Sequence, residues 1–253
     1  MVHVAYFTDP LCPWSWAAEP EVRRILVEFS EQVAFTYVMA GMSRDIDPDQ
    51  KLASTLDAMA ETGMPADPRL WLDRPPRTSY PACTAVKAAS EQGLDAHFLR
   101  RLRERAFLHR EPVDGAEAFL AAGRTVAGLD LDRFEADLRS EAVAGLFDTD
   151  RERSLAACGD QDRRPSLPAF SVAGGDPIGK AQLRAAVLAA GAEPAPLPGV
   201  EEALGRFDLL TTAEVAMVCD LPPLRVRVEL WRLAGASRAR PQELPFGEVW
   251  QAA

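Results

Sequence analysis

The chain opens with an apolar run that leads directly into a turn containing a cysteine. Residues Val2–Phe7 are almost all apolar or β-favouring, which predicts a strand buried on both faces of a sheet. Pro10 ends this run, and Pro13 suits the first turn of a helix that we expect over Trp14–Phe29. Cys12 should therefore lie at or beside the N-cap of that helix, so that the helix end directs its thiol.

The predicted position of Cys12 has a chemical consequence. Free backbone N–H groups and the positive end of the helix dipole stabilise an anion, and the thiolate is the form of cysteine that attacks disulfides. We therefore expect Cys12 to be a reactive thiol; the alternative is a small buried cysteine that only fills space. The neighbouring Pro13 and the pair Trp14 and Trp16 favour the functional interpretation.

The segment Asp9–Trp16, with the sequence Asp-Pro-Leu-Cys-Pro-Trp-Ser-Trp, resembles the active-site turn of the thioredoxin superfamily. The resemblance is to its DsbA-like branch, which usually carries Cys-x-x-Cys, but here Ser15 stands in place of the second cysteine. A lone thiolate leaves a mixed disulfide that another thiol has to resolve. Ser15 can at most donate a hydrogen bond to the sulfur of Cys12, so dithiol oxidase chemistry within this turn is excluded.

Composition limits the class of protein further. The 253 residues are 47% hydrophobic and 26% charged, which is ordinary for a soluble globular chain of one large or two modest domains. No membrane span or signal segment is recognisable, and the four cysteines are few and scattered, so we expect a cytoplasmic protein. A formal net charge of −10 argues against nucleic-acid and membrane partners. No cysteine or histidine spacing indicates a metal site.

The remaining chain is predicted to be an α/β thioredoxin fold interrupted by an all-helical insertion and followed by a small module. A second β-rich run, Val33–Met39, implies a strand parallel to the first through a right-handed crossover. The loop Gly41–Pro48 could hold ligands or simply connect elements. The expected limits are 1–48 and 159–191 for the thioredoxin fold, 49–158 for the insertion, 192–199 for a proline-rich linker and 200–253 for a winged-helix-like module.

Helical patterns in the insertion are separated by Gly, Pro or Asp. Cys83 lies in a helix rich in small residues that resembles the DsbA-like insertion helix near the active site. It is therefore either a packing cysteine or a resolving thiol for Cys12. Cys158 is a weaker candidate for a resolving thiol. The helices are expected at Lys51–Thr62, Ala82–Gln92, Asp95–Arg110, Ala116–Ala127 and Leu131–Leu146. A solvated basic face, or alternatively a partner surface, is expected from Arg100, Arg101, Arg103, Arg105 and Arg110.

Strand character returns at residues 165–172, where two prolines precede a short apolar run. In the thioredoxin superfamily a proline before the third strand is cis and lies against the active-site cysteine, and the resemblance places Pro168 there. The residue before it, Leu167, would supply backbone hydrogen bonds to a bound thiol. The resemblance thus implies a catalytic set, Cys12, Ser15 and Pro168, and a substrate-binding set, Pro13, Trp14 and Leu167.

The C-terminal module has a clear helix start. Thr211 and Glu214 have the spacing of a capping box, and a second helix over Pro222–Leu233 and a β-wing over Ala239–Trp250 complete a winged-helix pattern. The acidic character of the chain favours structural or protein-docking use of this module over DNA reading. As a DNA reader it would use Arg225, Arg227, Arg232, Arg238 and Arg240.

Together these motifs resemble the SpxH (YjbH) group of DsbA-like proteins over nearly the full length. That group includes adaptors that present a transcription regulator to the ClpXP protease, and its relatives include thiol oxidoreductases. The favoured hypothesis is an intracellular monothiol oxidoreductase without a bound cofactor, in which Cys12 attacks a protein or small-molecule disulfide and another thiol, for which a low-molecular-weight thiol is one candidate, resolves the mixed disulfide. The alternative is a non-catalytic adaptor that holds a client protein. A glutathione-transferase or isomerase variant is a weaker third choice.

Overall fold

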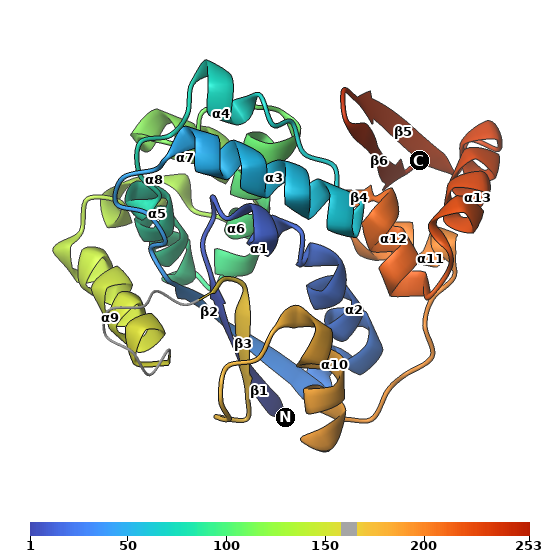
Figure 1. Cartoon of the computed structure of the whole chain (residues 1–253), viewed down its shortest axis with the longest axis horizontal. Helices are drawn as coiled ribbons and strands as arrows, with labels where there is room; N and C mark the ends of the chain where they lie inside the picture. The colour runs from blue at the N-terminus through green and yellow to red at the C-terminus, as the bar shows by residue number, and fades with distance from the viewer. Residues whose placement is uncertain (158–165) are drawn as a thin grey trace.

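The computed structural model describes residues 1–157 and 166–253. Its first sheet has the order β2-β1-β3, with β1 (Val2–Thr8) in the centre, β2 (Val33–Met39) parallel to it and β3 (Ala169–Val172) antiparallel. The predicted parallel pair of strands is therefore confirmed. β1 is buried on both faces only from Tyr6 onward, whereas His3 is exposed. The turn that contains the cysteine follows the carboxyl end of this central strand (Figure 1).

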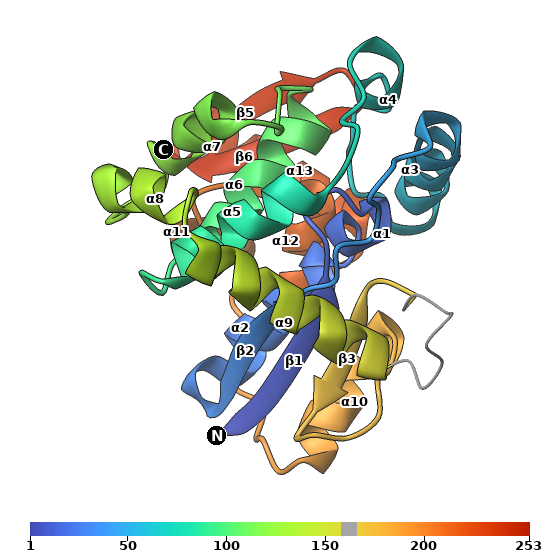
Figure 2. The ribbon, with the colours of Figure 1, turned by 90° about the vertical axis from the view of Figure 1, so that its left-hand side faces the viewer.

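Helices cover both faces of this sheet. Tyr6, which alternates with Phe7 along β1, packs with Phe170 against α2 (Glu19–Phe29) and α10 (Lys180–Ala189). Phe7 points to the opposite face, where the end of α9 (Glu141–Ala157) packs against it. In Figure 2 α9 crosses in front of the strands. The apolar side chains that pack with Cys12 therefore lie between the first sheet and α9.

The single helix predicted over Trp14–Phe29 is wrong, because the chain forms two helices there. The first, α1, spans only Pro13–Trp16, and α2 starts at Glu19. Pro20 lies in the first turn of α2, where its missing N–H is tolerated, but it could not sit inside one continuous helix.

The insertion is helical, as predicted, but several of its helices differ from expectation: a short helix at Leu70–Asp73 was not predicted, and the helix expected over Ala116–Ala127 ends at Gly123. The helix expected over Leu131–Leu146 is two helices, and the one expected over Asp95–Arg110 continues after Arg103 as a π-helical turn. A buried cluster that includes Trp16, Trp71 and Phe107 joins the insertion to α1. The helices before α9 are α3 (Pro48–Thr62), α4 (Leu70–Asp73), α5 (Tyr80–Ser90), α6 (Asp95–Arg103), α7 (Ala116–Gly123) and α8 (Leu131–Asp137).

The C-terminal module has its own sheet, in the order β4-β6-β5. The predicted capping box is confirmed: Glu214 N donates to Thr211 Oγ1, and Thr211 N donates to the Glu214 carboxylate at 2.7 Å. The assignment as a winged helix stays a prediction. The elements are α11 (Val200–Arg206), β4 (Leu210–Thr211), α12 (Thr212–Cys219), α13 (Pro223–Gly235), β5 (Ala239–Leu244) and β6 (Gly247–Ala252).

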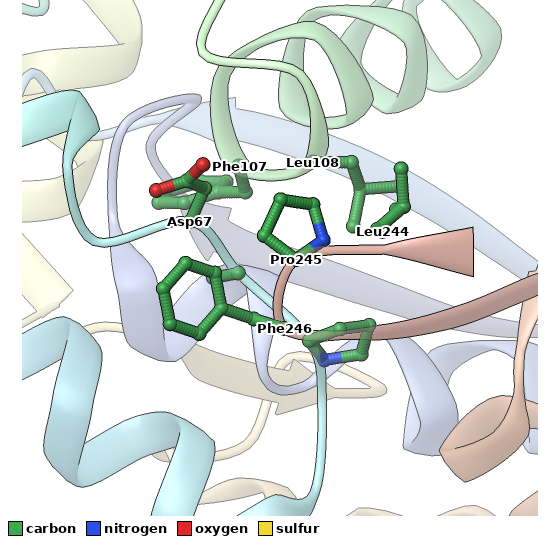
Figure 3. Close-up of a pocket in the computed structure, with 8 residues that line it drawn as sticks. Asp67, Phe107, Leu108, Leu244, Pro245 and Phe246 are labelled. Carbon is green, nitrogen blue, oxygen red and sulfur yellow. The ribbon is translucent and has the colours of Figure 1, made fainter.

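The C-terminal module packs on both other parts of the chain. Its α12 lies against α2 (Figure 1), and the turn between β5 and β6 lies against the insertion, where Phe246 and Pro245 approach Asp67 and Phe107 (Figure 3). The Arg69 guanidinium lies over the ring of Phe246, 5.6 Å from its centroid. Within the described ranges no helix has the length and apolar character needed to cross a membrane.

Candidate functional site

Cys12 lies at the N-cap of α1, as predicted. Its backbone is extended (φ −85°, ψ 116°), Pro13 follows as the first helical residue, and Trp16 N donates to the Cys12 carbonyl at 3.0 Å. Only 3% of the residue is exposed. The helix therefore directs the cysteine inward, toward the covered end of the sheet.

The thiol of Cys12 contacts the segment before β3. Its Sγ donates to the carbonyl oxygen of Leu167 at 3.9 Å, and the Leu167–Pro168 peptide bond is cis. Apolar side chains surround the sulfur, including those of Phe7 and Val38. The fold thus brings together the predicted residues Cys12, Leu167 and Pro168, although 155 positions separate the first two.

The role predicted for Ser15 as a hydrogen-bond donor to Cys12 is wrong. Its hydroxyl is buried and, among the described residues, has no hydrogen-bond partner. The Ser15 carbonyl instead accepts a hydrogen bond from the hydroxyl of Tyr6 at 3.1 Å. In this geometry Ser15 therefore makes no hydrogen bond to the sulfur of Cys12.

The aromatic residues of the turn have different environments. Trp14 is half-buried and packs beside Cys12, whereas Trp16 is fully buried, stacks on Phe107 and donates from Nε1 to the carbonyl of Pro65 at 2.9 Å. Pro13 and Leu167 are buried as well. Of the residues predicted to bind substrate, Trp14 is the one that reaches solvent.

Asp9 is the main site residue for which the sequence predicted no role. Its buried carboxylate accepts hydrogen bonds from the backbone N–H groups of Leu11 and Met42, both at 2.8 Å, and from the hydroxyl of Ser79 at 2.6 Å. An aspartate followed by proline at a strand end is a turn signal that could have identified it. Asp9 ties the cysteine turn to the loop after β2 and to α5.

Cys83 contacts Asp9 and is held there as a neutral thiol. Its Sγ donates to Asp9 Oδ2 at 3.5 Å. Burial raises the pKa of the Cys83 thiol well above its ordinary value, and the negative charge of Asp9 adds to this effect. This favours the packing interpretation of Cys83 over a resolving thiol. Cys158, the other candidate, lies outside the described residues.

Arg103 lies beneath the cysteine turn. Its Nη2 donates to Thr8 Oγ1 at 2.5 Å and to the carbonyl of Asp9 at 3.3 Å, and its Nη1 pairs with Glu19. The side chain is fully buried. Burial by itself would lower the pKa of Arg103, but the nearby Tyr6 and Glu19 outweigh it and raise the pKa. Arg103 therefore stays positively charged, and its hydrogen bonds hold the end of β1 in place.

Arg100, one turn earlier on α6, joins three carboxylates. Its guanidinium lies 3.2 Å from Glu19, 2.7 Å from Glu104 and 2.5 Å from Glu214, and Glu214 also pairs with Arg23 at 2.8 Å. Burial alone would lower the pKa of Arg100, but Glu214 and the other two carboxylates raise it. The central ion-pair cluster is defined as Glu19, Arg23, Arg100, Arg103, Glu104 and Glu214. It joins α2, α6 and α12.

The prediction that the arginines form a solvated face or a partner surface is therefore wrong for Arg100 and Arg103, because both side chains are buried. Their spacing of three places both on one side of α6, where they face carboxylates from other elements. The other three arginines lie at partly exposed positions. They form ion pairs as Arg101–Asp208, Arg105–Glu111 and Arg110–Asp67.

Two grooves on the described surface lie away from the thiol, whereas a small hollow beside α1 is lined by Pro13 and Trp16. One groove of about 480 Å³ is lined by Gly63, Thr212 and the β5–β6 hairpin, and one of about 460 Å³ lies on the insertion beside Arg74 and His109. Neither is lined by Cys12. Among the residues that the structure places, no group of His, Cys, Asp and Glu could hold a metal ion.

Comparisons with known proteins agree with this architecture. The family model described as thioredoxin matches residues 6–170. The ClpXP adapter protein SpxH of Halalkalibacterium halodurans is 28% identical over 97% of this chain and 87% of its own length, and that of Bacillus subtilis is 25% identical over 99% and 89%. The cytosolic disulfide reductase DsbM from Pseudomonas aeruginosa, solved with GSH, superposes with a TM-score of 0.59 at 19% identity over 74% of this chain and 96% of that one.

Proposed function

We propose, from the premise that this chain belongs to the thioredoxin family and has its DsbA-like fold, that it acts as a protein-binding adaptor. The curated relatives named ClpXP adapter align with 97–99% of the chain, including the C-terminal module that the thioredoxin model does not reach. The proposed role is to hold a client protein for a ClpXP-like protease.

The observation that carries this proposal is the closed environment of Cys12. Disulfide exchange requires a thiolate that an incoming disulfide can approach. Here the residue is 3% exposed and its thiol donates to the Leu167 carbonyl, while Ser15 supplies no second sulfur. The nearby Cys83 is a neutral donor to Asp9. A scaffold that binds proteins through its surface requires none of these groups to react.

A monothiol oxidoreductase is the second candidate, favoured by the position of Cys12 at a helix N-cap beside Pro168. In that reaction the Cys12 thiolate attacks one sulfur of a disulfide, forms a mixed disulfide and releases the other sulfur as a thiolate. An external thiolate then attacks the substrate sulfur and frees Cys12. DsbM has the same fold and was solved with GSH, which makes a glutathione-like thiol the natural co-substrate for this alternative.

The test is a protein-turnover measurement in the organism that encodes this chain. Deleting the gene should lengthen the half-life of at least one protein whose degradation also requires ClpX, and the wild-type gene should restore its turnover. Adaptor function predicts that Cys12→Ser restores turnover as well. The purified chain should then accelerate ATP-dependent degradation of that client by ClpXP.

Two results would count against the adaptor. If no ClpX-dependent half-life changes on deletion, the proposal is wrong. If the wild-type gene restores turnover but Cys12→Ser does not, while Cys219→Ser behaves as wild type, thiol chemistry is required and the second candidate takes precedence. Cys219 is the matched control because it is also a free, buried cysteine, but lies in α12.

A further inference from the structure

The outward face of α13 carries a stripe of large apolar side chains. Leu224, Val228 and Trp231 are 76%, 44% and 42% exposed, and their spacing of four and three residues places them on one side of the helix. The opposite side packs Val226 and Leu230 into the core of the module. The helix therefore has two apolar faces, of which one is covered and the other is open to solvent. An open apolar stripe rimmed by polar residues marks an interaction site.

Trp231 is held in place at this face. Its ring packs edge-on against Trp250, with the ring centroids 5.3 Å apart, and Trp250 in turn donates from Nε1 to Thr212 Oγ1 at 3.1 Å. A fixed indole loses little conformational entropy when a partner binds, and Trp and Arg are enriched among the residues that dominate binding energy. The stripe thus has a preorganised anchor.

Arginines border the stripe. Arg225 and Arg232 are seven residues apart and therefore lie along the same edge of α13, with one acidic residue, Glu229, between them. Neither forms an ion pair with any residue in the described part of the chain, whereas Arg227 pairs with Glu248 at 2.6 Å and Arg238 pairs with Glu201. In a chain with a net charge of −10, an open cationic edge complements an acidic partner.

These features distinguish a protein partner from DNA. Two of the five arginines proposed for DNA reading are neutralised by carboxylates. Three large apolar side chains occupy the centre of the face, where a DNA-reading helix would present polar groups to base edges and phosphates. We propose that the outer face of α13 binds an amphipathic helix of a partner protein, whose apolar side chains pack on Leu224, Val228 and Trp231 and whose acidic side chains pair with Arg225 and Arg232.

The proposal concerns binding alone and does not rest on the adaptor function. The probe is a fluorescein-labelled helical peptide of about 18 residues, roughly five turns, with leucines at positions i, i+4 and i+7 and glutamates on both flanks. Its controls are the same peptide with lysines in place of the glutamates, and a peptide of the same composition without the apolar period. Fluorescence anisotropy with the full chain should show saturable binding of the glutamate peptide and weaker binding of both controls.

Variants of the chain locate the site. Leu224→Ser and the pair Arg225→Glu with Arg232→Glu should each weaken binding of the glutamate peptide by about tenfold or more. Leu72→Ser and Arg74→Glu, at exposed positions on and beside α4, are the matched controls and should leave the dissociation constant unchanged. All these side chains are exposed, so the variants should fold, which circular dichroism checks.

Three outcomes would overturn the proposal. The first is no saturable binding of the glutamate peptide, or binding that the α13 variants do not change. The second is preferential binding of a DNA duplex that Arg225→Glu and Arg232→Glu abolish. The third is concentration-dependent self-association in sedimentation that Leu224→Ser abolishes, because a second copy of the chain would then cover the face.

Discussion

The guanidinium of Arg100 in the insertion lies 2.5 Å from the carboxylate of Glu214 in the C-terminal module, and both side chains are buried. The two residues are 114 positions apart in the chain. Glu19 of α2 contacts the same guanidinium at 3.2 Å, so one ionic site connects the thioredoxin fold, the insertion and the module. The three parts should therefore unfold together, with the module depending on the cluster for its position.

Replacing Glu214 tests this coupling. Glu214→Gln removes the closest of the three carboxylates around the buried Arg100, which keeps Glu19 and Glu104, so the cost should lie at or below the about 3–5 kcal/mol of breaking an isolated buried ion pair. We expect that loss in the free energy of unfolding measured with urea, and a separate early transition of the C-terminal module. Glu202→Gln removes an exposed pair with Arg206 and should cost less than about 1 kcal/mol. Equal effects of the two substitutions would contradict the structural role of the cluster.

The same carboxylate makes stability depend on pH. Burial would raise the pKa of Glu214, but Arg100 and Arg23 outweigh it and lower the pKa to about 2 from an ordinary value of 4.5. Because the folded-state pKa lies below the unfolded-state value, the stabilisation is fully present above pH 4.5 and is lost as the pH falls toward 2. The shift corresponds to roughly 3 kcal/mol.

The measurement is the difference in unfolding free energy between wild type and Glu214→Gln at several pH values. This difference isolates Glu214 from the other carboxylates, which titrate in both proteins. It should be constant near neutral pH and shrink on acidification below pH 4.5. A difference that stays constant down to the acid transition would mean that Glu214 is not held as a carboxylate by these arginines.

Features that depend on neighbouring residues could be predicted from the sequence. Features that depend on contacts between distant parts of the chain could not. The strand Val2–Phe7, Cys12 at a helix start and the capping box at Thr211 depend on neighbours within a few residues. Arg100 and Arg103 look like a basic surface because the carboxylates that pair with them come from distant elements. Their burial follows from tertiary packing, which no pattern within one helix encodes.

Asp9 should be required for the geometry of the cysteine turn. Asp9→Asn replaces one acceptor oxygen with an amide that cannot accept from both the Met42 N–H and the Ser79 hydroxyl, so a buried donor loses its partner. We expect a loss of about 1–3 kcal/mol in stability and faster alkylation of Cys12 as the turn loosens. Asp45→Asn, at an exposed position of the loop after β2 that also contains Met42, is the control. If the two variants match, the hydrogen bonds of Asp9 do not support the turn.

The buried thiols should label slowly in the native protein. Cys12 and Cys83 are almost fully covered, so alkylation requires local opening and should be roughly tenfold or more slower than in the urea-unfolded chain. Cys83 should react last, because burial raises its pKa and keeps the thiol protonated. Iodoacetamide labelling followed by intact mass, with Cys12→Ser to assign the adducts, gives the order. Rapid native labelling of Cys12 would favour the oxidoreductase over the adaptor.

The contact between the β5–β6 turn and the insertion requires glycine at position 247. Its backbone has φ +151°, and a Cβ built there would lie 2.8 Å from the Cβ of Pro65, a ring carbon that cannot rotate away. Gly247→Ala should therefore push the hairpin off the insertion and cost about 1–3 kcal/mol. Gly205→Ala is the matched control, since it lies in α11 with no atom near the added methyl group, and better helix propensity should stabilise the chain by up to about 1 kcal/mol. Urea unfolding of both variants measures the two changes in the free energy of unfolding. If Gly247→Ala is as stable as Gly205→Ala, the hairpin does not pack tightly against Pro65.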